Sequence, residues 1–142
     1  MIQIQTSVRI ARPADDVFAL LSDPLRFPLW NSAVTSVEGS GTTYVMHRSL
    51  PTGRAENGLE VVERDAPARF TIRTTSGPTP FVYRYTLSEE GGATVVALDA
   101  SVELDGPFAL LGPLGVRAVR RGIDANLETL RALLERTSTA AG

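Results

Sequence analysis

The residues in this chain that could carry out chemistry are few, and the only histidine, His47, is the first of them. It stands in the middle of "YVMHRSL", a stretch typical of a β-strand. A side chain that titrates near neutral pH is suited to general acid–base catalysis. The same histidine is equally compatible with a solvent-facing strand position or with a hydrogen-bonded place in a pocket wall. His47 is therefore a candidate both for catalysis and for ligand binding.

A second catalytic candidate, Tyr83, lies in "FVYRYTL", where the residues of one strand face alternate with those of the other. Phe81, Tyr83, Tyr85 and Leu87 share a face, and we expect Tyr85 and Leu87 to be core residues. A buried tyrosine hydroxyl needs a hydrogen-bond partner, and in a pocket that partner can be the ligand. Phe81 and Tyr83 are therefore predicted ligand contacts.

The stretch "GRAENGLEVVE" contains carboxylate side chains and one amide, and either type would place a polar group in the interior if it faced inward. A buried Glu56 or Glu60 would have a raised pKa and could serve in catalysis. The alternation instead favours solvent exposure of both glutamates, because Asn57 shares its parity with Leu59 and its apolar neighbours. We therefore expect Asn57 to face inward and to form hydrogen bonds with a ligand.

The apolar segment "GPFALLGPLGV", residues 106–116, precedes three arginines at positions 117, 120 and 121. This combination allows contact with a lipid surface, although arginines at helical spacing usually form a solvated face. Phe108 and Leu111 are predicted ligand contacts. Arg120 flanks the apolar stripe of the following helix, so it is predicted to meet a carboxylate or phosphate of the ligand.

The composition excludes several classes of protein and site. The 142 residues fit one domain, and a net charge of −2 does not favour nucleic-acid binding. The chain has no cysteine and one histidine, so we expect no disulfide, metal site or cofactor. Nucleotide-binding and nucleophile-elbow motifs are absent. Without a signal-like start or a long apolar run, a cytoplasmic location and no stable membrane insertion are expected.

Periodicity predicts the elements that must position these candidates. Residues 2–10 alternate as a strand, "RPADDVFALLSD" reads as a short helix, and Asp23-Pro24 starts a second one ending near Phe27 or Pro28. Six strands separated by short turns follow, so neighbouring strands should pair antiparallel. Their predicted ranges are 32–38, 43–50, 54–63, 69–75, 81–88 and 93–104.

The last segment changes to helical periodicity from about residue 113 to 136. One stripe of this helix is apolar; its members are Val116, Val119, Ile123, Leu127, Leu130 and Leu134. The concave face of a curved antiparallel sheet is the partner of matching length. A cavity should remain where helix and sheet diverge, with Val119 and Ile123 among its ligand contacts. We predict a single domain over residues 1–138 and a disordered tail over 139–142.

This succession resembles the START-like (SRPBCC) superfamily, which includes Bet v 1-type allergens, START lipid-transfer domains and polyketide cyclases. The resemblance rests on "RPADDVFALLSDPLRFPLWNSAVTSVE", "LEVVERDAPARFTIR", "YTLSEEGGATVV" and "GPFALLGPLGVRAVRRGIDANLETLRALLE". It is closest to the bacterial polyketide cyclase/dehydrase subfamily and implies an α+β helix-grip fold, with a seven-stranded curved antiparallel sheet around the long C-terminal helix. Alignment with the tetracenomycin aromatase/cyclase places Val62 and Val34 where that enzyme has a cavity arginine and tyrosine. This difference argues against aromatase activity.

The resemblance implies binding of a small hydrophobic molecule, polyketide-, lipid- or aromatic-like, between helix and sheet. The alternative is a cofactor-independent cyclase or dehydratase that uses acid–base residues in the same cavity. A third hypothesis is an interaction protein, and both monomer and homodimer remain open. Trp30, in "DPLRFPLWNSAV", is expected to plug the open end of the helix–sheet sandwich and to contact the ligand.

Overall fold

The computed structural model describes residues 1–50, 53–104 and 106–141, and among these the side chains of 106–108 and 137–141 are not described. The strands are β1 (Ile2–Ile10), β2 (Val34–Ser40), β3 (Thr43–Leu50), β4 (Gly53–Asp65), β5 (Arg69–Ser76), β6 (Phe81–Glu90) and β7 (Ala93–Val102). The helices are α1 (Ala14–Leu21), the 3₁₀ helices η1 (Pro24–Leu29) and η2 (Gly106–Leu111), and α2 (Pro113–Ala141).

The strands form one antiparallel sheet in the order β1-β7-β6-β5-β4-β3-β2. Strands β2 to β7 are neighbours in sequence and in space, and β1 returns to pair with β7, with Ile2 opposite Val102. The register shifts once between β2 and β3 and twice between β4 and β5. Such bulges bend a strand and increase its twist. The predicted α+β helix-grip fold is confirmed.

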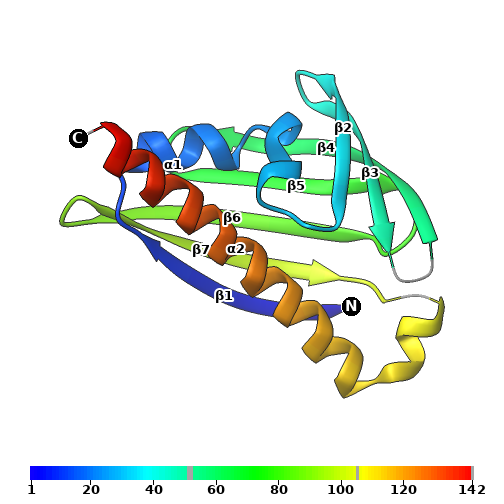
Figure 1. Cartoon of the computed structure of the whole chain (residues 1–142). Coiled ribbons are helices and arrows are strands. Elements are labelled where there is room, and N and C mark those ends of the chain that lie inside the picture. The colour runs from blue at the N-terminus through cyan, green and yellow to red at the C-terminus, as the bar shows by residue number, and fades with distance from the viewer. Residues whose placement is uncertain (51–52, 105, 142) are drawn as a thin grey trace.

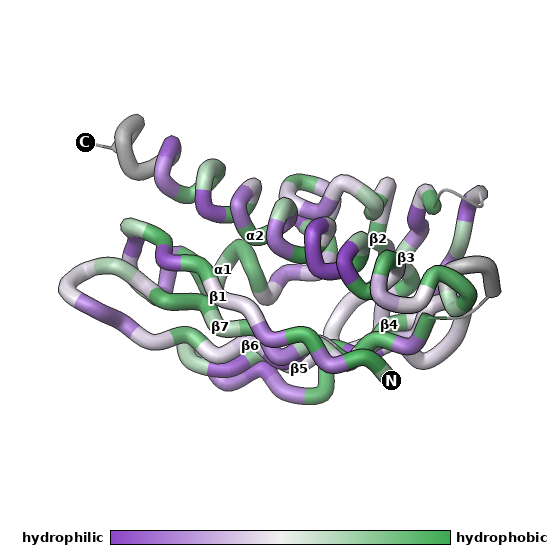
Figure 2. The backbone as a smooth tube through the Cα atoms, turned by 90° about the horizontal axis from the view of Figure 1, so that it is seen from below, coloured by the Kyte–Doolittle hydropathy of each residue, from purple (hydrophilic) through white to green (hydrophobic). Residues whose placement is uncertain are grey.

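The long helix α2 forms a second layer over the sheet, and its C-terminal end lies beside α1 (Figures 1 and 2). Its stripe is buried at Ile123, Leu127, Leu130 and Leu134 but only half-buried at Val119. The helix extends to Ala141, beyond the predicted helix end near residue 136. None of the helices described is long and apolar enough to cross a membrane.

The packed core lies below α1 and the C-terminal half of α2. Helix α1 buries Val17, Phe18 and Leu21. The Phe18 ring meets Phe70 edge-on, with centroids 6.5 Å apart, and Phe70 stacks on Tyr85 at 6.1 Å. This end of the sandwich is filled by large apolar side chains from both layers.

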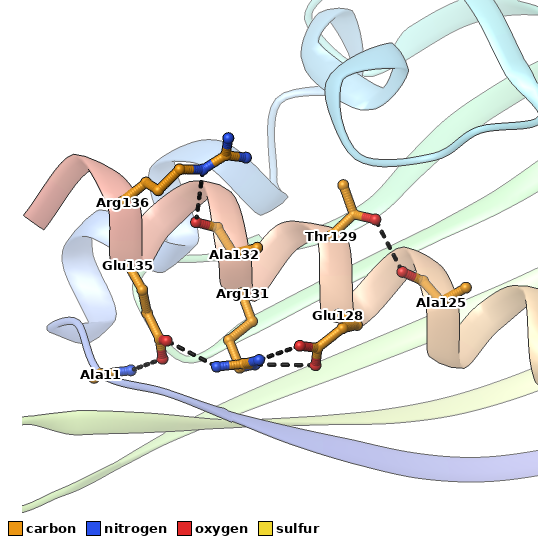
Figure 3. A network of polar contacts seen from close by, with 8 residues as sticks. All are labelled: Ala11, Ala125, Glu128, Thr129, Arg131, Ala132, Glu135 and Arg136. Atoms are coloured by element: carbon orange, nitrogen blue, oxygen red, sulfur yellow. Dashed lines mark hydrogen bonds and ion pairs between the residues drawn. The ribbon is translucent and has the colours of Figure 1, made fainter.

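Polar contacts tie the C-terminal half of α2 to the turn after β1 (Figure 3). The Arg131 guanidinium bridges the carboxylates of Glu128 and Glu135. Glu135 also accepts a hydrogen bond from the backbone N–H of Ala11, at 3.0 Å. Arg12 donates to the carbonyl oxygen of Leu134 at 2.7 Å. The helix end is thereby held by side chains as well as by apolar packing.

The second short helix sets the position of Trp30. The Asp23 carboxylate accepts from the backbone N–H of Leu25, and Pro24 occupies the first turn, as expected for a helix start. The helix runs to Leu29, slightly past the predicted end. The Trp30 backbone N–H then donates to the carbonyl of Phe27 at 3.1 Å. These contacts direct the chain from η1 into β2.

Candidate ligand-binding cavity

A cavity of about 310 Å³ lies between the N-terminal half of α2 and the sheet. It is bounded by residues of η1, by the ends of β3 and β7, by β6 and by α2. The cavity occurs where the sequence predicted one, and its size suits a compact organic molecule.

Aromatic side chains form two walls of the cavity. On β6, Phe81 stacks on Tyr83 with centroids 4.4 Å apart, and Tyr83 meets Tyr85 edge-on at 6.3 Å. From the η1 segment, Phe27 and Trp30 contribute an edge-on pair at 5.6 Å. Phe81, Tyr83 and Trp30 therefore lie where the sequence analysis predicted ligand contacts.

The α2 wall is built from small or medium side chains. It comprises Ala118, Val119, Gly122, Ile123 and Asn126. Val119 and Ile123 were predicted from the helix stripe. The remaining apolar lining residues are Ala33, Met46, Leu50, Ile72, Val102 and Leu104.

Arg48 lines the cavity and is held by Asn57, which does not. The Arg48 Nε donates to Asn57 Oδ1, and its Nη2 donates to the carbonyl of Pro78, each at 2.9 Å. Asn57 is fully buried and its Nδ2 donates to the carbonyls of Ser76 and Pro78. Asn57 faces inward as predicted, but its amide binds protein groups. The structure thus places Asn57 behind Arg48 and outside the cavity lining, where it positions the Arg48 guanidinium.

Burial keeps the two cavity tyrosines protonated. Burial raises the pKa of Tyr83 to about 12, against the opposing influence of the nearby Arg48 guanidinium. Burial, together with the neighbouring Tyr83, raises the pKa of Tyr85 still further. At neutral pH both phenols are neutral and offer O–H groups to the cavity.

His47 lies on the outer face of the sheet, although the sequence analysis made it a candidate for the cavity. Its neighbours Met46 and Arg48 line the cavity, so alternation turns His47 the other way. Its Nε2 lies 2.9 Å from Glu38 Oε1, and its Nδ1 lies 3.7 Å from Glu56 Oε2. We therefore no longer assign it a role in cavity chemistry.

Three further predicted contacts lie near the start of α2. Arg120 donates to the carbonyl of Gln5 at 3.1 Å and does not line the cavity. Leu111 is 46% exposed and also lies outside the lining. Phe108 belongs to η2, but its side chain is outside the described residues. Both Arg120 and Leu111 were predicted ligand contacts, and the structure places them outside the cavity lining.

Sequence reasoning missed several polar lining residues, among them Arg48, Asn31 and Asn126. For Arg48 the sequence did contain a signal, because Arg48 and Met46 are two positions apart on one strand and therefore face the same side of the sheet. For the two asparagines there was none, because they come from distant segments. Asn126 Oδ1 accepts from the backbone N–H of Ser32 at 3.4 Å, which joins α2 to the η1–β2 turn.

Residues 1–135 match the model of the family described as "Polyketide cyclase / dehydrase and lipid transport". The chain belongs to this family. No curated protein sequence matches it significantly.

The sequence alignment with the tetracenomycin aromatase/cyclase matched Val62 and Val34 to polar cavity residues of that enzyme. Val62 is 55% exposed beside a bulge of β4, Val34 is buried, and neither lines the cavity.

Solved structures support the fold of this family member. A START superfamily protein from Mycobacterium smegmatis superposes with a TM-score of 0.83 at 15% identity, covering 95% of this chain and 98% of that one. A conserved protein from Geobacillus kaustophilus gives 0.84 at 16% identity, covering 96% and 97%. A protein from Thermus thermophilus gives 0.81 at 19% identity, covering 96% and 99%. At these identities the likeness concerns the fold.

Proposed function

We propose that this chain binds a compact, largely apolar small molecule in the cavity between α2 and the sheet. The observation that carries the proposal is the aromatic-lined cavity of about 310 Å³. Each Å² of apolar ligand surface removed from water contributes about 25 cal/mol. The stacked rings of Phe81 and Tyr83 provide a wall suited to planar ligands.

The alternative is a cyclase or dehydratase of the kind that the family description names. Tyr83 would then be its proton donor. Because the pKa of Tyr83 is raised to about 12, the phenol is a weak acid at neutral pH. His47, the other acid–base candidate, lies on the opposite face. These positions favour ligand binding without turnover.

The test is titration of the protein with 2-ethylnaphthalene, a small apolar bicycle, by calorimetry. Val119→Trp should fill the cavity and lower the affinity at least tenfold. Arg121→Trp, on an exposed position of the same helix, is the matched control and should leave the affinity unchanged. Equal affinities for both variants would refute the proposal, and so would failure of the unmodified protein to bind either this hydrocarbon or its ketone analogue, 2-acetylnaphthalene. Native mass spectrometry of freshly purified protein then identifies any retained ligand.

A further inference from the structure

The indole of Trp30 carries a buried donor that lacks an acceptor. Trp30 is only 4% exposed, and its Nε1 has no hydrogen-bond partner among the residues that the structure describes. An indole N–H can donate but cannot accept. A buried donor left unpaired costs about 1–3 kcal/mol, so such a group in a folded protein calls for an explanation.

A small recess adjoins the main cavity beside Trp30. Its volume is about 10 Å³, roughly the space of one water-sized group. Trp30, Tyr83, Tyr85 and Asn126 line both spaces. The shared lining places the recess next to the space that a ligand would occupy.

The polar groups around the recess include several hydrogen-bond donors, and the Trp30 indole can only donate. Asn31 Oδ1 already accepts from the backbone N–H of Ala33 at 3.1 Å, and Asn126 Oδ1 accepts from that of Ser32. Each of these oxygens thus already accepts one hydrogen bond, whereas the amide NH₂ group of each side chain offers two donors. The phenols of Tyr83 and Tyr85 are protonated at neutral pH, and burial raises the pKa of each above its ordinary value, so both can donate an O–H. The recess is complementary to an acceptor.

We propose that the recess is a subsite for one hydrogen-bond-accepting oxygen of the ligand, such as a carbonyl, and that Trp30 Nε1–H is the specificity-determining donor. This inference rests on the proposed function. The ligand class is then an apolar, planar molecule with an acceptor oxygen at one end. An ammonium group at that end would bring a further donor and would leave the indole unpaired.

The first experiment compares 2-acetylnaphthalene with 2-ethylnaphthalene, which differ by one carbonyl. The ketone is the less hydrophobic of the two, so apolar burial alone would favour the hydrocarbon. We expect the unmodified protein to bind the ketone at least tenfold more tightly. Equal affinities, or a preference for the hydrocarbon, would overturn the subsite while leaving the proposed function intact. Failure of both molecules to bind would refute the proposed function itself.

The second experiment observes the donor directly. Trp30 is the chain's only tryptophan, so a ¹H–¹⁵N spectrum contains one indole resonance. The ketone should move its proton signal downfield, as hydrogen bonding does, and the hydrocarbon should not. The measurement uses the unmodified protein and needs no variant. An indole proton that responds equally to both ligands would overturn the assignment.

A third experiment uses a variant to distinguish the contribution of the Trp30 N–H from that of its aromatic ring. Trp30→Phe keeps an aromatic body against Phe27 but removes the N–H. We expect a roughly tenfold loss of affinity for the ketone and less than a threefold change for the hydrocarbon. A parallel loss for both ligands in a folded variant would mean that Trp30 acts only by shape. If the variant does not fold, the indole resonance of the unmodified protein decides.

Discussion

The two halves of α2 carry one continuous apolar stripe but meet different surroundings. In the C-terminal half, Leu130 and Leu134 are buried, and Glu135 is bonded to the turn after β1. In the N-terminal half, Val119 is half-buried and Gly122 borders the cavity. The difference lies in what faces the helix, because α1 fills the sandwich at one end only. The apolar stripe of α2 thus contributes to the core in the C-terminal half of the helix and to the cavity in the N-terminal half.

The largest contrast is expected from truncating one residue in each half. Leu130→Ala should destabilise the protein by about 2–5 kcal/mol, because the side chain is fully buried and leaves a cavity. Val119→Ala should cost at most about 1 kcal/mol, since part of its side chain already borders open space. Urea unfolding of both variants measures the two values. Equal losses would contradict the division of α2 into core and cavity halves.

The sequence predicted the fold well because alternation and helical periodicity record which faces are buried. The order of elements, the antiparallel pairing and the inward positions of Tyr83 and Asn57 all follow from these periods. Alternation alone does not say what a buried polar group binds. The partners of Asn57 come from β3, from the end of β5 and from the β5–β6 connection, so its role as a support for Arg48 needed the structure.

The orientation of His47 was within reach of the sequence, whereas the full cavity wall was not. His47 lies between Met46 and Arg48, and the buried apolar residue Met46 marks the inner parity of β3. In contrast, Asn31 and Asn126 are 95 positions apart and line the same cavity only because α2 packs on the η1–β2 turn, where Asn126 bonds to Ser32. Contacts of that kind depend on tertiary geometry, which local patterns do not encode.

Asn57 tests the polar support at the cavity end. Asn57→Ala removes one acceptor and two donor contacts of a fully buried side chain. Loss of these contacts within the buried interior should cost about 1–3 kcal/mol in the free energy of unfolding. Glu56→Ala, at the neighbouring exposed position, should change stability by about 0.5 kcal/mol or less. A similar small change for both would mean that the Arg48–Asn57 contacts contribute little.

The titration of Tyr83 at alkaline pH tests how deeply its phenol is buried at the same end of the cavity. Its pKa of about 12 in the folded protein exceeds the ordinary value of 10.0. The unfolded chain therefore loses this proton first, and the contribution of Tyr83 to stability is complete below pH 10 and declines as pH rises through 12. The difference in phenolate absorbance between the unmodified protein and Tyr83→Phe should show a midpoint near pH 12. A midpoint near pH 10 would contradict burial of the phenol.

Gly122 offers a gain in stability at the edge of the cavity. A Cβ added at this helical position would meet nothing within 4 Å outside its own helical surroundings. Gly122→Ala should therefore stabilise the protein by about 1 kcal/mol through helix propensity. Thermal unfolding measures the gain. A loss of stability would show that the backbone here needs the conformational freedom of glycine.

The smallest effect is expected from His47→Ala on the outer face. The His47 ring is partly exposed and pairs with Glu38 and Glu56, both of which are exposed. Pairs of this kind contribute little, so the variant should lie within about 0.5 kcal/mol of the unmodified protein. Its affinity for 2-ethylnaphthalene should also be unchanged, because the ring and the cavity lie on opposite faces of β3. Tyr83→Ala removes part of the cavity wall and should weaken binding of the same molecule. Weaker binding by His47→Ala together with unchanged binding by Tyr83→Ala would place the site on the outer face of the sheet.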